Sequence, residues 1–153
     1  MINARLSALL QPLQAELLGN DLAIEGVSTN SRAVQMDKLF ICLKGDRFDA
    51  HDFAAQAVKN GAAALLVERQ LDLPVPQLVV RDTRIALGRL AQWWRQQWGG
   101  TVVAITGSNG KTTTKQLMAA MLSMRGEVLA TKGNFNNEIG MPLTLLELRD
   151  EAR

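Results

Sequence analysis

One short segment of the chain carries the residue types that bind nucleotide phosphates. Residues 106–113 read Thr-Gly-Ser-Asn-Gly-Lys-Thr-Thr and follow the apolar run at 102–105. Glycines allow successive backbone N–H groups to converge on phosphate oxygens, and the start of a helix adds about half a positive charge. Lys111 places a full charge near the β- and γ-phosphates, and the Thr112 hydroxyl is suited to binding Mg²⁺, so we expect both to serve catalysis. The predicted ATP-binding residues are Gly107, Ser108, Asn109, Gly110, Lys111, Thr112 and Thr113.

The spacing of this segment departs from the usual P-loop. Ile105 stands five residues before Gly110, where that pattern has its first glycine. The alternative interpretation is a glycine turn that serves only to reverse the chain. A Gly-Lys-Thr triplet between a predicted strand and a predicted helix favours the phosphate site. A dinucleotide site of the Rossmann type is disfavoured, because its Gly-x-Gly-x-x-Gly spacing is missing.

A second polar loop, at residues 131–137, follows the short predicted strand 128–130. Ligands of open α/β sheets bind at the carboxyl ends of the strands, so Asn134 and Asn137 are candidates for holding phosphate, metal-bound water or substrate. Asparagine is also common in turns and at helix N-caps. A turn in which Asn137 caps the next helix is therefore an equal alternative.

Two further polar turns lie in the first half of the chain. Residues 28–32 combine small hydroxyl side chains with a guanidinium, and residues 44–47 place two cations beside a glycine. Either turn is able to hold a diphosphate, with Arg32 as a planar fork and Lys44 as a point charge. Alone, each is more typical of an ordinary polar turn. The candidate substrate-binding residues here are Ser31, Arg32, Lys44 and Gly45.

Alternating strand and helix signals predict an α/β fold that positions these loops. The predicted helices are 6–18, 49–59, 83–98, 113–124 and 141–148, and the predicted strands are 22–27, 39–43, 62–67, 77–81, 102–105 and 128–130. We expect a small N-terminal α/β substrate domain at 1–82, followed at 83–153 by the truncated start of a P-loop ATPase domain with a parallel sheet. Two strands are too few for that second sheet, which predicts a fragment of a longer protein.

The remaining chemistry-bearing residues are interpreted as structural. The single cysteine, Cys42, lies in an apolar strand and is predicted to be core, and the lone His51 is predicted at a helix N-terminus. Trp93, Trp94 and Trp98 have helical spacing that favours packing over base stacking. Leu117 and the three methionines of the same segment are likewise predicted to face inward, namely Met118, Met121 and Met124.

Composition excludes several classes of protein. The chain has 153 residues, of which 47% are hydrophobic and 21% charged, and this excludes disorder and fibrous repeats. A formal charge of +2 with scattered basic residues argues against nucleic acid as a partner. One cysteine, no secretory signal and no apolar run long enough for a membrane span predict a cytoplasmic location.

Taken together, these motifs resemble the Mur ligase family. Its ATP loop is similar to residues 106–113 and is one residue shorter than the usual P-loop, which accounts for Ile105. Other similar segments are Asn30-Ser31-Arg32, the stretch Leu43-Lys44-Gly45-Asp46-Arg47-Phe48-Asp49-Ala50-His51-Asp52-Phe53, and Gly133-Asn134-Phe135-Asn136-Asn137-Glu138-Ile139-Gly140-Met141-Pro142. Within the family they most resemble the ligases that add D-alanyl-D-alanine to UDP-N-acetylmuramoyl-tripeptide.

The resemblance implies ATP-driven amide formation through an acyl phosphate in peptidoglycan synthesis, with ATP and Mg²⁺ as cofactors and a monomeric full-length enzyme. It places Lys111 on the γ-phosphate, Thr112 near the metal, the candidates of the first half along the UDP-muramyl site, and the asparagines between the two substrates. The family's acidic metal ligand, histidine, modified lysine and last domain have no match within these residues, so we expect this segment alone not to ligate. The alternatives are a related Mur or folylpolyglutamate-type ligase, or a non-catalytic module that binds a nucleotide or UDP-sugar.

Overall fold

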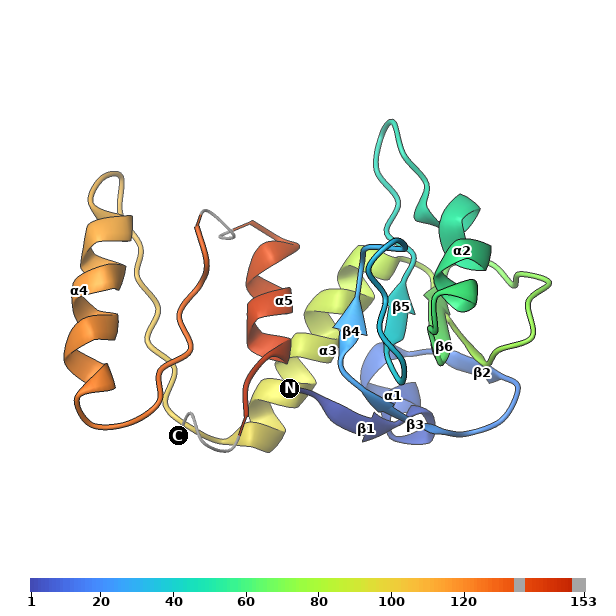
Figure 1. The fold of residues 1–153 in the computed structure, drawn as a ribbon, viewed down its shortest axis with the longest axis horizontal. Helices are drawn as coiled ribbons and strands as arrows, with labels where there is room; N and C mark the ends of the chain where they lie inside the picture. The colour runs from blue at the N-terminus through green and yellow to red at the C-terminus, as the bar shows by residue number, and fades with distance from the viewer. Residues whose placement is uncertain (134–136, 150–153) are drawn as a thin grey trace.

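The computed structural model describes residues 1–133 and 137–149. The elements in chain order are β1 (Asn3–Arg5), α1 (Leu6–Leu13), β2 (Glu16–Leu18), β3 (Ala23–Glu25), β4 (Val27–Ser28), β5 (Leu39–Ile41), the 3₁₀ helix η1 (Ala50–Phe53), α2 (Ala54–Lys59), β6 (Ala64–Val67), β7 (Gln77–Val79), α3 (Thr83–Trp98), α4 (Lys111–Ser123) and α5 (Gly140–Leu146). Figure 1 shows a sheet-containing lobe at one end, α3 and α5 in the middle and α4 at the other end. The expected α/β class is confirmed.

The central feature is a five-stranded sheet in the order β2-β7-β6-β5-β4. The strands from β4 to β7 run parallel, and only β2 is antiparallel to its neighbour β7. The strands β1 and β3 form a separate antiparallel ribbon. Because the parallel strands all end at the same edge, the loops after β5 and β6 lie close together there.

Side chains of the parallel strands alternate between two cores. Leu39, Ile41 and Leu66 pack with α1 and α3 on one face of the sheet. Phe40 and Leu65 pack with α2 on the other. All four residues of β6 are buried, as expected for a parallel strand that is covered on both faces, and this explains its unbroken apolar sequence.

The helix α3 connects the sheet to the second half of the chain. The Asp82 carboxylate caps it by accepting from the backbone N–H groups of Arg84 and Ile85, and Gly99 ends it with a φ of +68°. Its buried stripe packs on the sheet, while α5 lies along it and contributes Leu146 to the same core. The buried residues of the stripe are Thr83, Ala86, Leu87, Leu90, Ala91 and Trp98. Residues 83–98 thus form the predicted helix, and the tryptophans have the predicted packing role.

Two expected elements of the first half are wrong in detail. The predicted helix 6–18 ends at Leu13, because Gln14 adopts a left-handed conformation (φ +54°) and Glu16–Leu18 pairs with β7 instead. Two neighbouring leucines fit a strand as well as a helix, and the sheet edge decides between them. The predicted helix 49–59 is divided into η1 and α2, with the Asp49 side chain capping the first turn.

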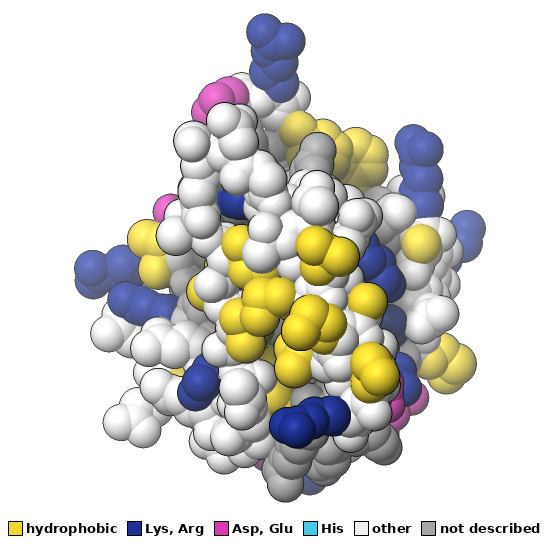
Figure 2. Space-filling model, turned by 90° about the vertical axis from the view of Figure 1, so that its left-hand side faces the viewer, with side chains coloured by type: hydrophobic (Ala, Val, Ile, Leu, Met, Phe, Trp, Pro, Cys, Tyr) yellow, Lys and Arg dark blue, Asp and Glu magenta, His cyan; other side chains and the backbone are white. Residues whose placement is uncertain are grey.

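Three expectations for the second half are also wrong. Residues 102–105 and 128–130 are not strands, and Val103 is 51% exposed, because no described strand lies beside either segment to form a ladder. None of the side chains of α4 is buried, although an inward face was predicted for this helix. Helical spacing identifies an apolar face but not what covers it, and no described segment buries this one. Figure 2 shows hydrophobic side chains gathered on the face that carries α4. The exposed large hydrophobic residues of α4 and its C-cap are Leu117, Met121, Leu122 and Met124.

Candidate functional site

The predicted phosphate loop leads directly into α4. Gly110 is the N-cap residue and has a φ of +76°, in the left-handed region that favours glycine, and Lys111 is the first helical residue. Gly110 has no side chain to cap the helix, so the first backbone N–H groups of α4 face outward from a thirteen-residue helix. Such a helix start attracts anions through its N–H groups and its dipole.

Two lysines of α4 point toward loop carbonyls beside this helix start. The Lys111 ammonium donates to the Gly107 carbonyl at 2.5 Å, which folds the charge back over the loop where a phosphate would bind. One turn later, Lys115 donates to the carbonyls of Thr131 (2.7 Å) and Gly133 (3.1 Å). Lys115 therefore joins the first turns of α4, which the phosphate loop precedes, to the loop that carries the asparagines. Sequence reasoning missed it, although its position four residues after Lys111 places both on one helix face.

A cavity of about 260 Å³ lies beside these lysines. The extended segment 102–105, the start of α4, the loop at 131–133 and the helix α5 enclose it. Its lining residues are Val102, Val103, Ala104, Ile105, Lys111, Thr112, Lys115, Thr131, Gly133, Met141, Thr144 and Leu145. A few polar side chains able to contact an anion thus line a mostly apolar hollow, as in many ligand sites.

The residues present fit a magnesium nucleotide. Thr112 supplies one hydroxyl at the helix start, and the described residues contain no cluster of three or more histidine, cysteine or carboxylate side chains. In phosphate loops that end in Gly-Lys-Ser/Thr, the hydroxyl at the helix start binds Mg²⁺ together with phosphate oxygens and water, and Thr112 supplies this hydroxyl here. Thr112 would hold the ion, which would neutralise charge on the phosphates.

Asn137 has the capping role that was the alternative to ligand binding. Its side-chain oxygen accepts from the backbone N–H groups of Gly140 (2.7 Å) and Ile139 (3.3 Å), at the start of α5. A role in substrate binding stays a prediction for this residue. Asn134, the other candidate, lies outside the described residues.

The first polar turn of the sheet lobe is held from its backbone. Asn60 donates to the Ser31 carbonyl at 2.8 Å, and the Arg32 N–H donates to the Asn30 side chain at 3.0 Å. Within the described part of the chain, the exposed Arg32 guanidinium has no hydrogen-bond or ion-pair partner. A hollow of about 210 Å³ separates the neighbouring residues 27–30 from α5. The turn is therefore ordered, while its cation is left available to a ligand.

The second polar turn is the loop 44–49, which projects from the end of β5 (Figure 1). The backbones of Lys44 and Asp49 form an antiparallel β-bridge across its base, and the Gly45 N–H donates to the Phe48 carbonyl at 2.7 Å. Arg84, at the start of α3, donates to the Lys44 carbonyl (3.1 Å) and pairs with Glu138 (2.9 Å). This arginine connects the loop with the segment that follows Asn137, and no local pattern in the sequence pointed to it.

A buried polar network supports the same loop. The His51 ring lies between the Asp49 carboxylate and the backbone N–H of Glu68, and its side chain is fully buried. Burial raises the pKa of Asp49, but hydrogen bonds from the His51 backbone, the His51 ring and Arg69 outweigh it and lower that pKa to about 2. His51 lies in the first turn of η1, as predicted for a residue at a helix N-terminus.

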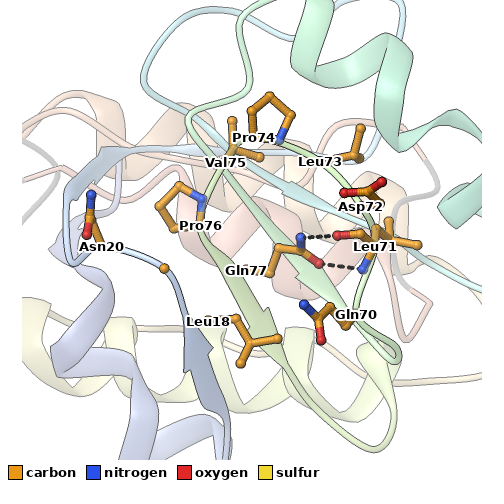
Figure 3. A pocket seen from close by; sticks show the side chains of 11 residues that line it. Leu18, Asn20, Gln70, Leu71, Asp72, Leu73, Pro74, Val75, Pro76 and Gln77 are labelled. Carbon is orange, nitrogen blue, oxygen red and sulfur yellow. Dashed lines mark hydrogen bonds between the residues drawn. The ribbon is translucent and has the colours of Figure 1, made fainter.

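Another hollow, of about 330 Å³, lies beside β2 and β7, at the edge of the sheet opposite β4. Gln77 is buried there, and its amide donates to the Leu71 carbonyl (2.6 Å) and accepts from the Leu71 N–H (2.9 Å), as Figure 3 shows. Both polar atoms of this side chain are therefore occupied in closing a loop. None of the predicted site residues lines this hollow, so its size does not make it the functional site.

Comparison with known proteins places the fold and the phosphate loop in one family. Residues 23–95 match the model described as "Mur ligase family, catalytic domain", and residues 105–153 match "Mur ligase middle domain". The chain belongs to the Mur ligase family.

Individual relatives show which members of the family this chain resembles. The chain is 54% identical over 151 residues to UDP-N-acetylmuramoyl-tripeptide–D-alanyl-D-alanine ligase of Escherichia coli (strain K12), covering 99% of this chain and 33% of that protein. It is 42% identical over 142 residues to UDP-N-acetylmuramoyl-L-alanyl-D-glutamate–2,6-diaminopimelate ligase of Syntrophomonas wolfei, covering 89% of this chain and 29% of that protein.

Solved structures agree with these relatives. A crystal structure of MurF from Acinetobacter baumannii matches with a TM-score of 0.92 at 42% identity, covering 99% of this chain and 34% of that one. MurF from Thermotoga maritima, in complex with ADP, matches with a TM-score of 0.72 at 37% identity, covering 84% and 30%. The chain spans about a third of the length of the proteins it matches.

Proposed function

We propose that this chain is part of an ATP-dependent ligase that joins D-alanyl-D-alanine to UDP-N-acetylmuramoyl-tripeptide in peptidoglycan synthesis. The observation that carries the proposal is the loop 107–113, which enters α4 through a left-handed Gly110 and places Lys111 at the first helical position. The high identity to ligases of that name supports the choice of substrates. The unpaired, buried Cys42 is in keeping with a reducing, cytoplasmic compartment.

In this proposal the two halves of the chain have different tasks. Residues 1–82 hold the UDP-muramyl end of the precursor, with Ser31, Arg32, Lys44 and Gly45 along it. Residues 83–153 begin the ATP-binding domain, with the phosphates at 107–113. Arg84 and Lys115 support this division of labour, because each joins the candidate loop of one site to the segment around the asparagines.

The reaction follows from these positions. The terminal carboxylate of the tripeptide attacks the γ-phosphorus of ATP, ADP leaves, and an acyl phosphate forms. The amine of D-alanyl-D-alanine then attacks the acyl carbon, phosphate leaves, and the amide remains. Lys111 turns from the Gly107 carbonyl to the γ-phosphoryl oxygens and offsets their charge, which is the main protein contribution to such transfers. Mg²⁺, when bound, would be held by Thr112 and would neutralise further charge on the phosphates.

Calorimetric titration of the chain with UDP-N-acetylmuramoyl-tripeptide, and separately with Mg-ATP, tests the proposal. We expect Arg32→Ala to weaken the first ligand about tenfold, the cost of one charge-assisted contact, and to leave the second unchanged. Lys111→Ala should have the reverse pattern. A folded chain that binds neither ligand would contradict the proposal.

The same titration separates the diaminopimelate-adding ligases from the proposed one. Those relatives act on a precursor with one residue fewer, and one of them is 42% identical to this chain. Tighter binding of the UDP-muramyl-dipeptide than of the tripeptide would favour that activity.

A further inference from the structure

His51 is the only histidine of the chain, and its ring is enclosed by the lobe rather than open to a ligand. Its Nε2 lies 2.9 Å from the backbone nitrogen of Glu68, which has a hydrogen to donate. Nε2 must therefore accept, and it carries no proton. In a neutral imidazole the proton then belongs to Nδ1, which faces the Asp49 carboxylate at 2.5 Å. The geometry selects one tautomer.

The Asp49 side of the ring controls the loop 44–49. The Asp49 carboxylate also accepts from the His51 backbone N–H at 2.9 Å and from Arg69 at 3.1 Å, so three donors hold it in place. The backbones of Asp49 and Lys44 form an isolated antiparallel β-bridge at the base of the loop. Next to Asp49, the Phe48 ring stacks on Phe53 with centroids 5.2 Å apart. The orientation of this carboxylate thus fixes where the loop leaves the lobe.

The Glu68 side of the ring connects to the edge of the sheet. Glu68 follows β6, and its carboxylate accepts from the Thr83 N–H at 3.1 Å. The Thr83 hydroxyl donates to the Cys42 carbonyl at 2.9 Å, at the end of β5. The next residue, Arg84, holds the Lys44 carbonyl. The ring therefore ties the loop to the carboxyl ends of two parallel strands and to the start of α3.

We propose that His51 is a positioning residue, which holds Lys44 and its loop in place for the UDP-linked substrate by donating from Nδ1 to Asp49. The proposal rests on the proposed function, because it assumes that this loop meets the substrate. His51 itself touches no ligand. The Glu68 N–H donates to Nε2 on the other side of the ring and so keeps Nε2 unprotonated. The ring proton is therefore on Nδ1, which faces Asp49.

Nuclear magnetic resonance of the chain with ¹⁵N-labelled histidine tests the tautomer, since a single imidazole contributes. We expect Nδ1 protonated and Nε2 unprotonated at neutral pH. A ring protonated at Nε2 alone would overturn the proposal, because it could not donate to Asp49.

Two substitutions test the contacts of the two ring nitrogens separately. His51→Asn retains an N–H donor near the position of Nδ1, and His51→Gln retains an acceptor near the position of Nε2. We expect His51→Gln to increase amide hydrogen exchange at Gly45 about tenfold and to weaken UDP-N-acetylmuramoyl-tripeptide binding by a similar factor. We expect His51→Asn to stay within about twofold of the unmodified chain in both measurements.

The outcomes distinguish this inference from the proposed function. Amide exchange at Gly45 is measured without ligand, so it tests the role of His51 whether or not the chain binds UDP-N-acetylmuramoyl-tripeptide. A chain that does not bind this precursor would contradict the proposed function only. Equal effects of the two substitutions, or none, would overturn the positioning role. If His51→Gln does not fold, Asp49→Ala takes its place, because it removes the acceptor that faces Nδ1, and Asp49 lies at the surface of the lobe with 24% of its side chain exposed.

Discussion

The charge on Asp49 has a stabilising effect that depends on pH. Its pKa in the folded chain is about 2, whereas the ordinary value is 3.8. Because the folded pKa is the lower one, the carboxylate stabilises the fold at every pH above about 4, and this contribution is lost as the pH falls from about 4 to about 2. At one pKa unit per 1.36 kcal/mol, the ceiling is about 2 kcal/mol at pH 7, and about half of it is left at pH 3.

Asp49→Asn tests this magnitude. The asparagine retains an oxygen for the His51 donors but loses the charge opposite Arg69, and the side chain is partly exposed, so we expect a loss of about 1 to 2 kcal/mol at pH 7. Urea unfolding followed by tryptophan fluorescence at pH 7, 5 and 3 measures it. The deficit of the variant should shrink to about half at pH 3.

Asp52→Asn is the matched control. Asp52 faces the same arginine, but from 3.9 Å and with 70% of its side chain exposed. We expect it to change the free energy of unfolding by less than about 0.5 kcal/mol at any pH. A deficit for Asp49→Asn that is the same at pH 7 and pH 3, or that Asp52→Asn reproduces, would show that the hydrogen bonds to the Asp49 carboxylate do not set its pKa.

Three further predictions concern the buried cysteine, a leucine of the core and the N-cap of α3. Burial, together with the nearby Asp49 charge, raises the pKa of the Cys42 thiol to about 12, so a thiol reagent at pH 7.5 should label the unfolded chain and leave the folded one unlabelled; labelling without urea would contradict the buried position. Leu66→Ala should cost 2 to 5 kcal/mol, about the usual range for a fully buried leucine, whereas Leu117→Ala, at 61% exposure, should cost less than about 0.5 kcal/mol in the same urea titration. Asp82→Ala should lower the stability by about 1 kcal/mol through the lost cap of α3, and Asp82→Asn, which retains an acceptor, should recover most of that loss.

Local signals predicted the elements whose ends are marked by particular residues. The bounds of α3 were predictable because Asp82 is a strong N-cap and Gly99 ends the helix in a left-handed conformation. The apolar run of β6 indicated a strand covered on both sides, which the structure confirms. By contrast, β2 could not be predicted, because Leu17 and Leu18 satisfy helical and strand spacing equally and pairing with a distant strand decides between them.

The same limit explains which parts of the candidate site the sequence did not predict. The phosphate loop is encoded locally, since adjacent glycines, a lysine and a helix start suffice to specify it. Arg84 and Glu138 are 54 residues apart, and His51 meets the Glu68 backbone 17 residues away, so neither contact leaves a pattern of spacing. These are the contacts that join the candidate loops to each other and to the sheet. Residue types therefore predict what a loop can bind, whereas contacts between distant segments determine whether two loops can hold one substrate together.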